Sequence, residues 1–238
     1  MLRAPLPLLL LLAAIPLTVY VAVVKAPIPG DVELARATQT VGGLELLAEA
    51  VNWAGDLRWI PAAAFYGVWL ARSEPGTRRG VVWSGVALLV LQGGSQVLKI
   101  VVDSPRPSPE YGIAVDRARA SGGFPSGHVY GDVLTYGALI VFAPAVAGRW
   151  SPPIQAASAA VILLAGWARV YVGAHWPSDV IGGYLWGAVA LAAVVAVSRR
   201  SLLPRAGATM AAELRHRRCE GLQAGDPRPN ERQESDSR

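Results

Sequence analysis

The chain has 238 residues, of which 53% are hydrophobic and 16% charged. A soluble core of this size requires fewer apolar residues, so the composition indicates a membrane protein. The net charge of +5 does not indicate nucleic-acid binding, because the basic residues lie between apolar runs or in the C-terminal tail. The only cysteine, Cys219, also lies in the tail, so we expect neither an intramolecular disulfide nor a cysteine cluster for a metal.

The first predicted element is an apolar helix at Leu6–Val24. It is long enough to span a membrane and follows Arg3, which indicates a transmembrane helix or an uncleaved signal anchor. A cleaved signal peptide is the alternative. Residues 25–56 are more polar and acidic, and they predict a surface or interfacial helix with Trp53 at the level of the lipid headgroups. We expect residues 1–56 to form this helix and an extracytoplasmic interfacial segment.

Further apolar stretches follow along the chain. Residues 57–71 are few for a span, but snorkelling of Arg58 and Arg72 can extend it. The other predicted spans are 80–102, 126–147, 154–171 and 177–197. The fold class predicted is therefore all-α, an integral membrane bundle of six transmembrane helices whose active site lies at the extracytoplasmic helix ends. Residues 57–198 are the expected helical core, and residues 199–238 a basic, disordered cytoplasmic tail.

The distribution of Lys and Arg predicts the orientation in the membrane. Fourteen of the 22 basic residues become cytoplasmic if the N-terminus, the 72–79 turn, the 147–153 turn and the tail are inside. This orientation places the loops 103–125 and 172–176 together on the extracytoplasmic face. Five of the other basic residues fall outside, and three lie at the outer helix ends. The five are Lys25, Arg36, Arg58, Arg117 and Arg119, and the three are Lys99, Arg106 and Arg169.

Polar residues interrupt one face of the stretch 80–102. The spacing between successive polar residues is three or four positions, so they lie on one face of a helix. Polar groups in a span are costly unless they line a site or find partners. Neutralisation of Lys99 by Asp103 remains an alternative to a role in a site. The polar residues of this face are Gln92, Gln96, Lys99 and Asp103.

Three short motifs on the predicted outer face suit the binding of a phosphate. Lys99, Arg106 and Arg169 are three cations that can stabilise the charge on phosphate oxygens during transfer. Ser126 and Gly127 begin a predicted helix, whose first backbone N–H groups and Ser hydroxyl can hold an anion. The other residues of the three motifs carry titratable groups. They are His128 in that first turn, His175, and Asp179 one turn after His175. An imidazole oriented by a carboxylate suits nucleophilic phosphoryl transfer.

This pattern resembles the type 2 phosphatidic acid phosphatase superfamily, which also includes vanadium-dependent haloperoxidases. The resemblance implies that His175 attacks phosphorus and becomes a phosphohistidine, while Asp179 orients its ring. His128 would protonate the departing alkoxide and later activate water. The phosphate would be bound by Lys99, Arg106, Ser126, Gly127 and Arg169, without a metal or another cofactor. One position departs from the family, which commonly has Ser where this chain has Ala168, so one hydroxyl contact is missing.

Two features outside the motifs lead to further hypotheses. Asp132 lies four residues after His128 and so on the same helix face, where it could orient that histidine. The alternative is that Asp132 pairs with a polar group on a neighbouring helix. Gly183 and Gly187 form a pair of small residues that predicts a helix packing surface.

The function predicted is that of an integral membrane phosphatase acting on a lipid phosphate or pyrophosphate. Candidate substrates are phosphatidic acid, phosphatidylglycerol phosphate and undecaprenyl pyrophosphate. The partners are accordingly a phospholipid or polyprenyl phosphate and the bilayer, with no nucleic acid; the oligomeric state is not predicted. Two alternatives remain, a vanadate-dependent haloperoxidase and a non-enzymatic membrane transporter. His216 lies in the Arg-rich tail and is expected to be a solvated side chain.

Overall fold

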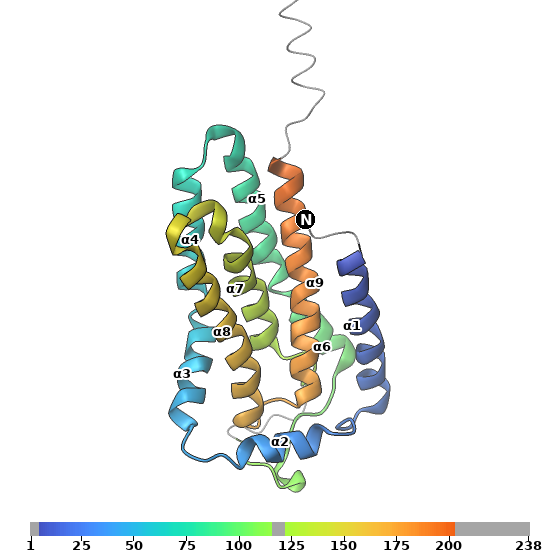
Figure 1. Ribbon diagram of the computed structural model, residues 1–238. Coiled ribbons are helices and arrows are strands. Elements are labelled where there is room, and N and C mark those ends of the chain that lie inside the picture. The colour runs from blue at the N-terminus through green and yellow to red at the C-terminus, as the bar shows by residue number, and fades with distance from the viewer. Residues whose placement is uncertain (1–4, 116–121, 203–238) are drawn as a thin grey trace, which may run out of the picture. The chain divides into compact units, whose positions relative to one another are not determined.

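The computed structural model describes residues 5–115 and 122–202, which are helical and contain no strand (Figure 1). The all-α prediction is confirmed for this part of the chain, whereas Arg117, Arg119 and residues 203–238 of the tail lie outside it. The helices are α1 (Pro5–Val24), α2 (Asp31–Gln39), α3 (Glu45–Asp56), α4 (Trp59–Arg72), α5 (Pro75–Leu91), α6 (Gly94–Val102), α7 (Gly127–Val146), α8 (Ser151–Tyr171) and α9 (Pro177–Leu202), with 3₁₀ turns at Pro109–Tyr111 and Gly148–Trp150.

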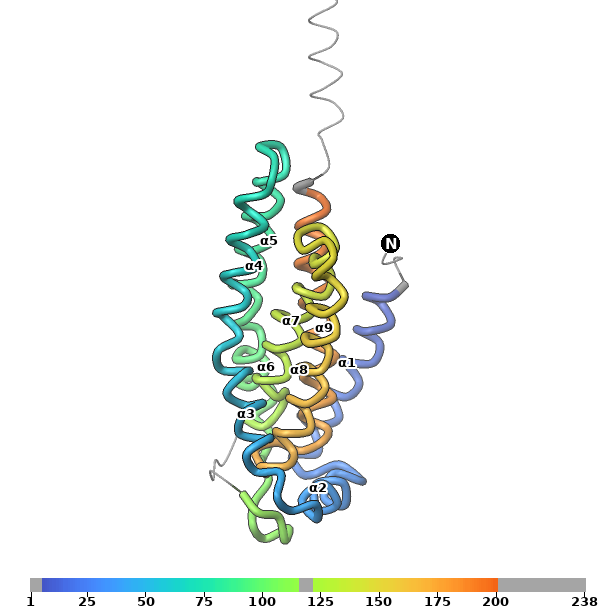
Figure 2. The backbone as a smooth tube through the Cα atoms, turned by 60° about the vertical axis from the view of Figure 1, so that its left-hand side comes forward, coloured from blue at the N-terminus to red at the C-terminus, as the bar shows by residue number. Residues whose placement is uncertain are grey.

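Five helical stretches of the described chain are long and apolar enough to cross a membrane. They are Leu6–Val24, Pro75–Val102, Gly127–Val146, Gly148–Tyr171 and Pro177–Arg200. The protein is therefore an integral membrane protein. The remaining predicted span corresponds to α4, which has 14 residues and is too short to qualify by itself. In Figures 1 and 2, α4 continues from the end of α3, so the two helices extend along the same side of the bundle.

Helix α7 is the centre of the bundle. In the apolar stretch of α7, 78% of the residues are buried inside the protein, whereas in that of α1 the share is 11%. Helix α1 lies at the edge of the bundle (Figure 1). Helices α3, α4, α6 and α8 all contact α7. A buried apolar cluster on α7, which includes Leu134 and Phe142, packs against Trp69 of α4 and Val194 of α9.

The predicted packing role of Gly183 and Gly187 on α9 is confirmed. A Cβ atom on Gly183 would lie 2.9 Å from the Ser126 carbonyl oxygen and from Cβ of Val129. A Cβ atom on Gly187 would lie 2.8 Å from Cβ of Val133. Because such separations are too short for real side-chain contacts, α9 approaches α7 this closely only with glycine at both positions.

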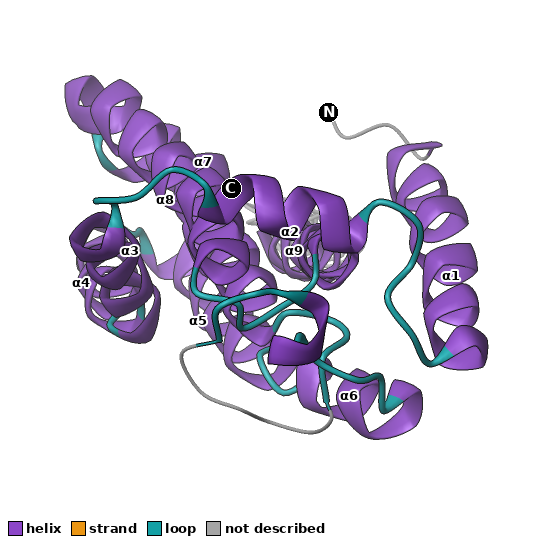
Figure 3. Cartoon of the chain, turned by 90° about the horizontal axis from the view of Figure 1, so that it is seen from below, coloured by secondary structure: helices purple, strands orange, loops and turns teal. Residues whose placement is uncertain are grey.

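The segment after α1 forms two helices with different positions. Helix α2 crosses the end of the bundle at which α8 ends and α9 begins (Figures 1 and 3). Helix α3 instead runs along α8, burying its small residues Ala48, Val51 and Gly55. The loops 103–115 and 172–176 lie at the same end as α2 (Figure 1).

Candidate active site

A cavity of about 1270 Å³ lies between helices α3, α6, α7 and α8 and the loop before α9. Six of the eight residues predicted for the site line it, and the other two, Ser126 and Asp179, are buried beside it. The six lining residues are Lys99, Arg106, Gly127, His128, Arg169 and His175. The structure thus brings together residues that are up to 80 positions apart in the sequence.

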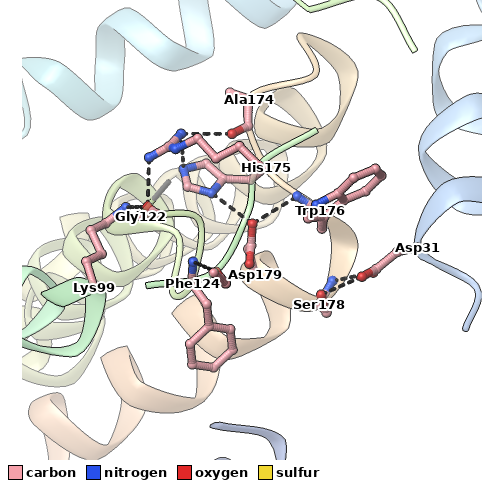
Figure 4. Close-up of polar contacts among 11 residues, drawn as sticks. Asp31, Lys99, Gly122, Phe124, Ala174, His175, Trp176, Ser178 and Asp179 are labelled. Atoms are coloured by element: carbon pink, nitrogen blue, oxygen red, sulfur yellow. Dashed lines mark hydrogen bonds and ion pairs between the residues drawn. The ribbon is translucent and has the colours of Figure 1, made fainter. Parts of the chain in front are cut away.

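His175 and Asp179 form a buried pair at the beginning of α9. Nδ1 of His175 lies 3.3 Å from Oδ2 of Asp179, and this oxygen also accepts the backbone N–H of Trp176 at 3.1 Å (Figure 4). On the other side of the ring, Nη1 of Arg106 lies 3.4 Å from Nε2. Because a guanidinium only donates and a carboxylate only accepts, the proton belongs on Nδ1 and the lone pair on Nε2.

The surroundings of His175 keep its imidazole neutral. Burial lowers the pKa of this histidine well below its usual value, and the positive charges of Lys99, Arg106 and Arg169 lower it further. A neutral imidazole with a lone pair on Nε2 is the nucleophilic form. At neutral pH, His175 is therefore ready to attack an electrophile that enters among these cations.

Two of the cations are tied to the loop before α7. Nζ of Lys99 donates to the Gly122 carbonyl at 2.7 Å, and Nη2 of Arg106 donates to the same oxygen at 2.9 Å. Nη1 of Arg106 donates to the Ala174 carbonyl at 2.9 Å (Figure 4). Beside this loop, a Cβ atom on Gly123 would lie 3.0 Å from Oδ2 of Asp179. Gly123 therefore allows close contact between this loop and the histidine–carboxylate pair.

The beginning of α7 presents donors that suit an anion. Ser126 precedes the helix, and its backbone N–H donates to the Asp179 carbonyl at 2.9 Å, which joins α7 to α9. Its hydroxyl is buried and has no hydrogen-bond partner. The first turn has no side-chain cap, so the N–H groups that begin at Gly127 have no acceptor within the helix. Together they form a donor set for phosphate oxygens.

Helix α3 supplies two site residues that sequence reasoning missed. Oδ1 of Asp56 lies 2.8 Å from Nε2 of His128, and Oδ1 of Asn52 accepts a hydrogen bond from Nη1 of Arg169 at 3.1 Å. Residues 52 and 56 lie one turn apart on one face of α3. No local motif marks them, because each partner is 72 or more positions away.

The hypothesis that Asp132 orients His128 is wrong. Neither carboxylate oxygen of Asp132 has a hydrogen-bond partner, and the nearest cation is Nη1 of Arg58 at 4.0 Å. Arg58 immediately precedes α4, so the alternative of pairing with a neighbouring helix describes Asp132 better. The carboxylate bonded to His128 is Asp56, from a different helix.

Two more residues support the site from outside the cavity. Asp31, the first residue of α2, accepts the backbone N–H of Ser178 at 2.8 Å and its hydroxyl at 2.7 Å (Figure 4). Burial raises the pKa of Asp31, and the bonds from Ser178 oppose this effect. Ala168, where the family commonly has Ser, is buried in a cluster with Ala48 and Val51 of α3. Its small side chain belongs to the α3–α8 packing.

Within residues 5–115 and 122–202, no group of three His, Cys, Asp or Glu side chains is close enough to hold a metal ion. Around His175 the charged groups are the cations Lys99, Arg106 and Arg169, whereas α3 contributes the carboxylates Glu45, Glu49 and Asp56 to the cavity wall. The arrangement suits transfer of an anionic group to Nε2 of His175, with His128 across the cavity as a proton donor.

A family model and a curated protein match this chain. The model of the PAP2 superfamily matches residues 80–202. An undecaprenyl-diphosphatase of Sulfolobus acidocaldarius is 28% identical over 190 residues, which cover 75% of this chain and 84% of that protein.

Two solved structures share the fold. One is a transmembrane PAP2-type phosphatidylglycerolphosphate phosphatase from Bacillus subtilis, with a TM-score of 0.63 and 21% identity over 84% of this chain and 98% of that one. The other is LpxE from Aquifex aeolicus, with a TM-score of 0.53 and 20% identity over 71% of this chain and 99% of that one.

Proposed function

We propose that this chain, which belongs to the PAP2 superfamily, hydrolyses a lipid phosphate or pyrophosphate through a phosphohistidine at His175. The observation that carries the proposal is the state of His175. Its Nε2 lone pair lies in a cavity with Lys99, Arg106 and Arg169, while Asp179 holds the proton on the other nitrogen.

In the first half of the reaction the phosphate oxygens lie among the three cations and the first turn of α7, including Ser126 and Gly127. Nε2 of His175 forms a bond to the terminal phosphorus. In a lipid monophosphate the bond from phosphorus to the lipid oxygen breaks; in a pyrophosphate the bond to the bridging oxygen breaks and the lipid monophosphate leaves. Asp179 stabilises the positive charge that develops on the ring. His128 gives its proton to the departing lipid alkoxide, a contribution of about 10²–10⁴-fold.

In the second half His128, now neutral, takes a proton from water. The resulting hydroxide attacks phosphorus and breaks the bond to Nε2 of His175, which releases inorganic phosphate. Both histidines then return to their starting protonation states. Charge on the phosphate is balanced by Lys99, Arg106 and Arg169, so the reaction does not require a metal ion.

The substrate is a lipid with a terminal phosphate or pyrophosphate, and the site reads this group rather than the tail. Phosphatidic acid, phosphatidylglycerol phosphate and undecaprenyl pyrophosphate all qualify. The names of the Sulfolobus and Bacillus proteins favour the last two. A lipid held in the bilayer reaches the cavity sideways, because the site lies at the ends of membrane-spanning helices.

The site faces the extracytoplasmic side, because that orientation leaves most Lys and Arg residues in the cytoplasm. Helices α3 and α4 together make the sixth crossing of the membrane. Residues 45–72 contain 28 positions, which suffice for a helical path through the bilayer even with the break at Leu57–Arg58.

Phosphate release from a panel of these three lipids tests the proposal. The purified protein in detergent with a metal chelator should release phosphate from at least one of them, and His175→Ala should lose about 10³-fold or more of this activity. His216→Ala serves as the control because it removes the one histidine that belongs to none of the three sequence motifs, and it should keep full activity. Full activity of His175→Ala would exclude the mechanism.

A further inference from the structure

Asp56 occupies a place that helix stability does not explain. It is the last residue of α3, and no basic residue lies in that last turn. The carbonyl end of a helix carries partial negative charge, which disfavours a carboxylate there. The favourable contact of Asp56 is the 2.8 Å bond to Nε2 of His128 on α7. This indicates that the carboxylate is placed to bind His128 and not to stabilise its own helix.

The packing of α3 brings Asp56 to this histidine. Ala48 and Val51 of α3 are buried against Ala165 and Ala168 of α8. At Gly55 the helix also approaches α7, where an added Cβ would lie 3.0 Å from Oδ2 of Asp132 and 3.5 Å from Cδ2 of His128. The end of α3 is therefore held against the first turns of α7.

Each of the two histidines of the cavity has one ring nitrogen bonded to a carboxylate. His175 donates from Nδ1 to a carboxylate and keeps a lone pair on Nε2. A carboxylate only accepts, so the bond to Asp56 places a proton on Nε2 of His128 and leaves Nδ1 as its second nitrogen. The Asp56 side chain is 65% exposed, so water screens its charge and the directional bond matters more.

We propose that Asp56 is the positioning residue of His128, one that fixes its ring and tautomer so that Nδ1 exchanges the catalytic proton. The inference rests on the proposed function, in which His128 serves the leaving group and then water. In the first half the imidazolium gives the Nδ1 proton to the lipid alkoxide; in the second half Nδ1 takes a proton from water. The Nε2 proton stays with Asp56 throughout, so the carboxylate begins and ends the cycle unchanged. Residue 56 lies outside the residues matched by the family model.

The dependence of the rate on the leaving group tests this role. A lipid alkoxide needs a proton to depart, whereas the nitrophenolate of p-nitrophenyl phosphate leaves without one. Asp56→Ala should therefore lower kcat/KM about tenfold or more for the lipid phosphate but less than about threefold for p-nitrophenyl phosphate. Asp56→Asn, whose amide oxygen can still accept the Nε2 proton, should lose less than Asp56→Ala on the lipid.

Glu49→Ala is the matched control. It removes another carboxylate from α3 that lines the same cavity, two turns from Asp56. It should change kcat/KM for both substrates by the same factor. Equal losses on both substrates for Asp56→Ala would overturn the positioning role.

His128→Ala separates this inference from the proposed function. It should show a stronger leaving-group dependence than Asp56→Ala. If His128→Ala is selective and Asp56→Ala is not, the inference fails and the proposed function stands. If His128→Ala also affects both substrates equally, its role in the proposed function fails and the role of Asp56 fails with it.

Discussion

At the scale of single residues, His175 is defined by what binds its two ring nitrogens. Asp179 accepts a hydrogen bond from Nδ1, and the Arg106 guanidinium approaches Nε2. These two contacts together determine which nitrogen carries the proton. The same cations that suit a phosphate also disfavour a second proton on this ring. In the proposed mechanism, one set of charges therefore both binds the phosphate and keeps the nucleophilic ring neutral.

The pKa of His175 tests the burial of its ring together with the effect of these charges. The folded-state pKa lies below the usual value of about 6.5, so the neutral form persists as the pH falls through 6.5. The unfolded chain then binds the proton first, and His175 makes the folded state less stable as the pH decreases further. The chain has three histidines, so NMR with ¹⁵N-labelled histidine can follow each one.

Lys99→Met should raise the pKa of His175 towards 6.5, because it removes one of the positive charges that lower it. The acid limb of kcat/KM that belongs to His175 should move to higher pH with it. Lys25→Met removes the other lysine of the chain and should leave this pKa unchanged. A wild-type His175 that titrates near 6.5 would contradict the electrostatic account.

Motif spacing predicted the cavity residues well but not their partners. Lys99, Arg106 and His175 could be found because the residue types follow one another at fixed short spacings. Asn52, Asp56 and Asp31 make contacts across 117, 72 and 147 positions, which no local pattern encodes. The four-residue spacing of His128 and Asp132 was misleading, because the end of α3 approaches this face and supplies Asp56.

At the scale of helices, apolar runs predicted most positions within a few residues. The span expected at 126–147 is Gly127–Val146, for example. The breaks within the helical rods were not predicted: the run 80–102 is divided between α5 and α6 near Gly93. An apolar run indicates only the length and hydrophobicity of a segment. The residues on both sides of this break are apolar, so the run does not reveal the break.

The contact between α7 and α9 should control activity, because α7 carries His128 and His175 immediately precedes α9. Gly183→Ala would place a Cβ 2.9 Å from the backbone oxygen of Ser126, so the helices must separate. We expect a destabilisation of about 1–3 kcal/mol and a clear loss of kcat/KM. Thermal unfolding and lipid phosphate hydrolysis in detergent measure the two effects.

Gly67→Ala on α4 is the matched control, since a Cβ there meets no atom within 4 Å. The same substitution in an open helix position should leave activity unchanged and stabilise the helix by about 0.5–1 kcal/mol. If both variants behave alike, close approach of α7 and α9 does not position the site.

At the scale of the whole molecule, the described chain combines an apolar bundle with a polar, cationic cavity between its helices. Composition could predict the membrane bundle, because apolar spans follow from the energetics of a bilayer. The charge bias gives the orientation that we propose. The cavity could be predicted only as a set of residues. Its shape depends on where α3 packs along α8, which the sequence pattern of residues 25–56 did not indicate.

The central claim is that His175 carries the phosphoryl group during turnover. Rapid quenching of the enzyme with a ³²P-labelled lipid phosphate, followed by peptide mapping, measures this directly. We predict an alkali-stable, acid-labile label on His175 in the wild-type protein and no label in His175→Ala. Label that persists in His175→Ala, or that maps to another residue, would contradict the account.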